Sequence, residues 1–84
     1  HKQQRGKIYI AVIHYTGDQA GDEVIRCFGK RRHFVKSKTM RKEKTEMAVE
    51  LYCRQNDMDF MEKIRSIEDV EDVTLIQYNG EYHG

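Results

Sequence analysis

The sequence predicts an α+β domain in which a four-stranded antiparallel sheet carries two helices on one face. Two observations lead to this prediction. Residues 46–53 alternate apolar and polar side chains, which is the period of a strand with one buried face. Strand-like and helix-like segments follow one another in the order strand–helix–strand–strand–helix–strand. Right-handed crossovers then place both helices on one face of the sheet, in the split-βαβ or ferredoxin-like arrangement.

The first two predicted strands differ in their surroundings. Residues 8–15 are β-branched or aromatic and are apolar on both sides, which is typical of a central strand. Residues 34–40 place Lys36 and Lys38 on one face, which predicts an edge strand protected by charge. The sequence therefore separates an interior strand from an edge strand.

The third predicted strand returns against the second after a charged turn at residues 41–44. Its predicted buried face comprises Met47, Val49, Leu51 and Cys53, and its other face comprises Glu46, Ala48, Glu50 and Tyr52. Residues 70–78 form the fourth predicted strand. Because the first and third strands are the most apolar, we expect them to form the central pair.

Two segments have the spacing of amphipathic helices. Asp18 is expected to cap the first helix, and Asn56 or Asp57 is expected to cap the second. The apolar stripes are Ala20, Val24, Ile25, Cys27 and Phe28 in the first helix, and Phe60, Met61, Ile64 and Ile67 in the second. Three cations at residues 30–32 suit the negative end of the first helix dipole.

Length and composition predict one charged, folded domain. The 84 residues include 15 basic and 14 acidic side chains, so no overall basic excess favours nucleic acid as a partner. The domain is expected over residues 8–80, between a polar lead-in at 1–7 and a tail at 81–84. No apolar run has the length of a membrane span. The chain begins at His1 rather than at methionine, so we expect a fragment of a longer protein, with a processed tag remnant as the alternative.

The reactive side chains predict no catalytic site, cofactor or metal. Cys27 and Cys53 are expected to be reduced, buried thiols rather than a disulfide or a metal pair. His14, His33 and His83 do not have the spacing of metal ligands, and no glycine-rich phosphate loop is present. We therefore predict that the chain is not an enzyme.

The same strand order occurs in RNA-recognition motifs, and residues 8–10 resemble the start of their first-strand motif. The third strand of those motifs needs exposed aromatic residues with a basic residue and glycines. Here that strand offers Tyr52 with Glu46 and Glu50, whose carboxylates would repel phosphate. RNA binding is therefore the less favoured function, and no nucleic-acid partner is expected.

Asp18-Gln19-Ala20-Gly21 resembles the Asp-x-x-Gly segment of ACT-like regulatory domains, which bind amino acids at a domain interface. The resemblance implies that Asp18 and Gly21 contribute to a small-ligand site, with the ligand unknown. The alternative is a helix cap followed by a small residue. A sensing domain for amino acids is therefore an alternative function.

A broader resemblance rests on residues 35–39, residues 50–52 and the tail at 70–82. These segments are similar to the soluble C-terminal domain of an uncharacterised family of small bacterial integral membrane proteins, whose layout is comparable to that of MgtC-type proteins. The resemblance implies upstream membrane helices and a cytoplasmic, ACT-like domain at the inner membrane. Lys2, Arg5 and Lys7 suit a segment that leaves a membrane on the cytoplasmic side. The expected function is that of a non-catalytic regulatory or assembly domain.

The sheet face away from the helices is predicted to be an interaction surface. The first strand has Ile8, Ile10 and Val12 on one side and Tyr9, Ala11 and Ile13 on the other. We assign Tyr9, Ala11 and Ile13 to the open face together with Ala48 and Tyr52, although the opposite parity is also compatible with the pattern. A surface this apolar predicts docking or self-association. Homodimerisation is the simplest form, and Glu46 and Glu50 indicate a modest contact.

Overall fold

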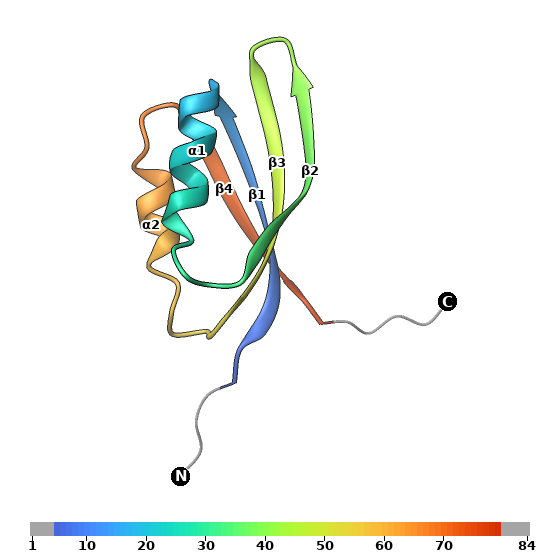
Figure 1. Ribbon diagram of the computed structural model, residues 1–84, viewed down its shortest axis with the longest axis vertical. Coiled ribbons are helices and arrows are strands. Elements are labelled where there is room, and N and C mark those ends of the chain that lie inside the picture. The colour runs from blue at the N-terminus through green and yellow to red at the C-terminus, as the bar shows by residue number, and fades with distance from the viewer. Residues whose placement is uncertain (1–4, 80–84) are drawn as a thin grey trace, which may run out of the picture.

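A computed structural model describes residues 5–79 and confirms the α+β ferredoxin-like class (Figure 1). The elements are β1 (Lys7–Thr16), α1 (Asp18–Cys27), β2 (His33–Arg41), β3 (Lys44–Cys53), α2 (Phe60–Arg65) and β4 (Val70–Tyr78). Both helices lie on one face of the sheet, and the β2–β3 hairpin extends past them (Figure 1). His1, Lys2, His83 and the predicted tail at 81–84 lie outside the described residues.

The strand order in the sheet is β2-β3-β1-β4, and all three pairings are antiparallel. The predicted central pair of first and third strands is therefore confirmed, as is the edge position of β2. A bulge between Val35 and Ser37 corrects one detail of β2. It breaks the alternation, so that Lys36 lies 3.6 Å from Glu50 whereas Lys38 pairs with Met47. The two lysines therefore do not share a face.

The core lies between the helices and one face of the sheet, and β3 contributes its predicted apolar face to it. The fully buried large side chains are Phe28, Phe60, Ile13, Met47, Leu51, Ile64, Val24 and Val49. Burial of this apolar area is the main favourable term in the folding of the domain. Across residues 5–79, neither helix has the length and apolar character needed to span a bilayer.

The assignment of Tyr9, Ala11 and Ile13 to the open face was wrong. These three side chains are at most 5% exposed and pack under the helices. The reason is the register, in which they lie opposite Leu51, Val49 and Met47 respectively. Directly opposed residues of an antiparallel pair point to the same face, so the buried face of β3 determines the buried face of β1.

Both helices begin at different residues from those predicted. Gly17 is the N-cap of α1 and has a φ of 92°, a conformation that glycine adopts without strain. The chain therefore turns directly into the helix, and Asp18 is its first residue rather than its cap. The N-cap of α2 is Asp59 instead of Asn56 or Asp57. The Asp57 carboxylate instead accepts a hydrogen bond from Arg31 Nη2 at 2.6 Å.

Arg31 connects the segments that follow α1 and precede α2. Its Nη1 donates to the carbonyl of Phe28 at 3.1 Å. This bond satisfies a free carbonyl at the C-terminus of α1, where the helix dipole also favours a cation. Its Nη2 also donates to Asp57 and Asp59, and its guanidinium lies 5.0 Å from the centroid of the Phe60 ring. One cation of the predicted cluster at 30–32 therefore holds two loops together.

Candidate functional site

The candidate site is the sheet face opposite the helices, which we call the open face. Both pairings of β1 keep a constant register from Ile8 to His14, so side chains align in rows across β4, β1 and β3. The rows are Tyr78–Ile8–Tyr52, Ile76–Ile10–Glu50, Thr74–Val12–Ala48 and Asp72–His14–Glu46. β2 adds Phe34, Ser37 and Thr39 to the last three rows in turn. The open face therefore changes from aromatic and aliphatic at one end to charged at the other.

The apolar end of the open face is solvent-exposed. Phe34, Tyr52, Ile76 and Tyr78 are each between 49% and 53% exposed, and Ile8 and Ile10 lie between them in the rows. Single exposed apolar side chains are ordinary, but a contiguous group on one face is typical of a binding surface. Ala48 and Tyr52, both predicted for the interaction face, lie on this side of the sheet.

Gly6, just before β1, leaves room for the Tyr52 ring to pack against the backbone. A Cβ atom built on Gly6 would lie only 2.6 Å from Tyr52 Cε2, so a larger residue would displace the ring. Beside the ring is a hollow of about 240 Å³ lined by Ile8, Arg32, Phe34, Glu50, Leu51 and Tyr52. The Lys36 ammonium lies 5.2 Å from the centroid of the Phe34 ring, within reach of a cation–π contact. The apolar end therefore has shape as well as hydrophobicity.

The charged end of the open face is organised around His14. Its Nδ1 lies 2.6 Å from Asp72 Oδ1 on β4, and its Nε2 lies 2.9 Å from Glu46 Oε1 on β3. Two carboxylates facing both ring nitrogens favour the imidazolium, which donates from each nitrogen. The pKa of His14 is raised above its ordinary value, first by the hydrogen bond that it donates to Asp72 and then by the one that it donates to Glu46. His14 therefore links three strands by charge-assisted hydrogen bonds.

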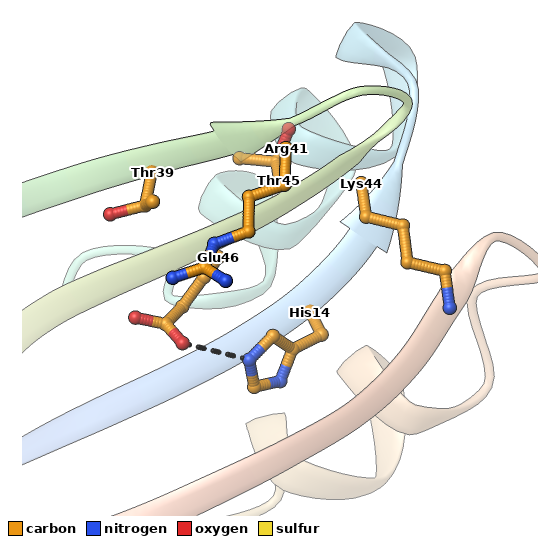
Figure 2. Close-up of a pocket in the computed structure, with 6 residues that line it drawn as sticks. All are labelled: His14, Thr39, Arg41, Lys44, Thr45 and Glu46. Atoms are coloured by element: carbon orange, nitrogen blue, oxygen red, sulfur yellow. Dashed lines mark hydrogen bonds and ion pairs between the residues drawn. The ribbon is translucent and has the colours of Figure 1, made fainter.

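A polar hollow of about 430 Å³ adjoins this cluster and is lined by His14, Thr39, Arg41, Lys44, Thr45 and Glu46. Figure 2 shows the Arg41 side chain extending over the sheet toward Glu46, while Lys44 points away toward β4. There the Lys44 Nζ lies 2.8 Å from Glu71. The charges in and around the hollow thus alternate in sign.

The raised pKa of His14 predicts a pH-dependent stability. The stabilisation by protonated His14 is complete below the pKa of the unfolded chain, about 6.5. It is lost as the pH rises through the higher pKa of the folded protein. Because His14 and both carboxylates are more than a third exposed, we expect a loss of only about 0.5 kcal/mol. Urea unfolding of the wild-type chain and of His14→Gln across this interval measures it. A difference between the two proteins that grows with pH would contradict the prediction.

The structure gives the predicted ligand residues Asp18 and Gly21 different surroundings. Asp18 is exposed in the first turn of α1, whereas Gly21 is buried against Tyr15. A Cβ atom on Gly21 would lie 2.7 Å from the Tyr15 hydroxyl oxygen, so the glycine allows α1 to approach β1 closely. Helix–strand packing therefore explains the glycine at position 21. Of the two residues predicted to bind a ligand, only Asp18 has an exposed side chain.

The thiols differ in their burial. Cys53 is buried, as predicted, whereas Cys27 is only partly so, and both are free. Burial raises the pKa of both thiols, which disfavours the reactive thiolate. Within residues 5–79, no group of histidine, cysteine and carboxylate side chains is arranged to hold a metal ion.

Sequence reasoning missed several side chains of the open face. His14 and Glu46 were noticed separately, but their meeting with Asp72 depends on two strand pairings. Ile76 and Tyr78 were placed in a strand without a face, although their spacing of two residues places them on the same side. That alternation was the available signal for β4.

Comparison with known proteins does not assign the chain to a family. No protein-family model matches the sequence, and no curated protein matches it significantly.

Proposed function

We propose that the chain is a non-catalytic assembly or regulatory domain that binds a polypeptide surface through the open face. The contiguous, half-exposed apolar end formed by Phe34, Tyr52, Ile76 and Tyr78 carries this proposal. Burying such side chains against a partner contributes binding energy, and aromatic residues are favoured in interface centres. The sequence resemblance supports the further proposal that the chain is a cytoplasmic domain of a bacterial inner-membrane protein, joined to upstream membrane helices.

The charged end supports specificity in the same contact. Ion pairs at the edge of an interface add little affinity but suppress wrong partners and set orientation. Here the carboxylates of Glu46 and Asp72 are paired with His14, so a partner can approach without leaving these acceptors unmatched. The face therefore combines an apolar anchor with an orienting polar region.

Site-specific photo-crosslinking in the whole protein tests this proposal in the cell. A photo-crosslinking amino acid replaces Thr74, an exposed residue of the third row, or Asp22, an exposed residue of α1 on the opposite layer. We expect a discrete crosslinked product from position 74 and none from position 22. Equal yields from both positions, or no product from position 74, would reject the open face as the binding surface.

A further inference from the structure

We propose that the partner is a second copy of this chain, bound open face to open face about a two-fold axis parallel to the strands. In this dimer β2 of each copy lies over β4 of the other, and β1 lies over β3. The inference rests on the proposed function and names its partner. Two gradients on the open face, one along the strands and one across them, determine the direction of the axis.

The first gradient runs along the strands. A two-fold axis parallel to the strands places the apolar row Tyr78–Ile8–Tyr52 near the same row of the second copy, because it brings like ends together. An axis perpendicular to the strands would place that row over Asp72, His14 and Glu46. The His14–Asp72–Glu46 cluster would then lose its water to aromatic rings that offer its remaining polar atoms no hydrogen bond, which is costly. Hydrophobic matching therefore favours the parallel axis.

The second gradient runs across the strands. On the open face β2 presents Lys36 and Arg41 and no acidic residue, whereas β4 carries Glu71 and Asp72 and no basic residue. The parallel axis places each cationic β2 over the anionic β4 of the other copy, and the symmetry forms this contact twice. The perpendicular axis would place β2 over β2 and β4 over β4 in opposite directions, so Asp72 would lie over Tyr78 of the second copy and would meet no cation. Charge complementarity therefore selects the same axis.

The central strands are compatible with this packing. β1 of one copy lies over β3 of the other, which brings His14 toward Glu46 of the second copy. Sheets packed face to face cross at roughly 30°, which permits such side chains to interdigitate. Four strands and four rows give a face of roughly 20 Å by 25 Å, smaller than that of a standard interface. We therefore expect a dimer that dissociates in the micromolar range.

A charge-swap experiment on the 84-residue chain tests the axis. Analytical ultracentrifugation is carried out on the wild type, on Arg41→Glu, on Asp72→Lys and on an equal mixture of these two variants. We expect each single variant to weaken dimerisation about tenfold, because each introduces two repulsive contacts. The mixture should recover dimers. In the mixed dimer one β2–β4 contact has the introduced pair of charges and the other has the native pair.

Two controls separate the axis from the surface. The variants Lys30→Glu and Glu68→Lys carry the same charge changes away from the open face. Neither variant, nor their equal mixture, should change the dissociation constant of the dimer. Ile76→Ser removes a half-exposed apolar side chain without adding charge, and it should weaken the wild-type dimer. Circular dichroism establishes that each variant retains its fold.

The outcomes distinguish this inference from the proposed function. A wild-type chain that remains monomeric at about 500 μM would overturn the second copy as partner. A crosslink from position 74 to a different polypeptide would overturn it too, yet would keep the open face as the binding surface. A dimer that is weakened by Ile76→Ser but not recovered by mixing the charge variants would overturn the parallel axis alone.

Discussion

Replacing Phe60 by alanine is expected to lower the free energy of unfolding by about 3–5 kcal/mol, the range for truncating a fully buried phenylalanine. Phe60 is 0% exposed and opens α2, where its ring centroid lies 5.5 Å from that of Phe28. The loss would leave a cavity where α1 and α2 meet. It would also remove the aromatic face beneath Arg31.

Equilibrium unfolding in urea measures this loss. Phe60→Leu is the matched control, because it keeps most of the apolar volume and should lose less than half as much stability. α2 is only six residues long, and so short a helix depends on its packing rather than on its intrinsic propensity. A loss below about 1.5 kcal/mol for Phe60→Ala would show that the α1–α2 contact adds little to the stability of the domain.

Replacing Leu51 by alanine is expected to cost about 2–5 kcal/mol. Leu51 is 1% exposed on β3, and it lies opposite Tyr9 of β1 and His33 of β2. Truncation removes contacts to both neighbouring strands and leaves a cavity under the helices. The same unfolding experiment, carried out at a protein concentration too low for association, measures the effect.

The adjacent residue provides the matched control for Leu51. Tyr52 points to the open face and is about half exposed, so Tyr52→Ala should cost less than about 1 kcal/mol. The contrast between two neighbouring residues tests the period of the strand rather than the general sensitivity of β3. Similar costs for both substitutions would contradict the assignment of the two faces.

Local patterns in the sequence were sufficient for the fold. The alternation at Met47, Val49 and Leu51 predicted the buried face of β3, because side chains of a strand alternate whatever its neighbours are. The apolar composition of β1 and the lysines of β2 predicted a central strand and an edge strand. The starts of α1 and α2 were not predicted, because the backbone turn at Gly17 and the bond from Arg31 to Asp57 are not visible in helical spacing.

The candidate site was less accessible to sequence reasoning. Both sides of β1 are apolar, so its own pattern does not identify the side that faces the helices. That choice follows from the register with β3, which places Tyr9 opposite Leu51. The open face thus carries Ile8, Ile10 and Val12 in place of the three residues first assigned to it.

The sequence by itself determined the order of the six elements, the central pair of strands and the buried face of β3. Each of these was inferred from the pattern within single segments and from the order of those segments along the chain. Only the tertiary structure decided the buried face of β1, the bridging role of Arg31 and the meeting of His14 with Glu46 and Asp72. Two strand pairings bring His14, Glu46 and Asp72 together. Register between distant strands depends on packing across the whole core, and no local period encodes it.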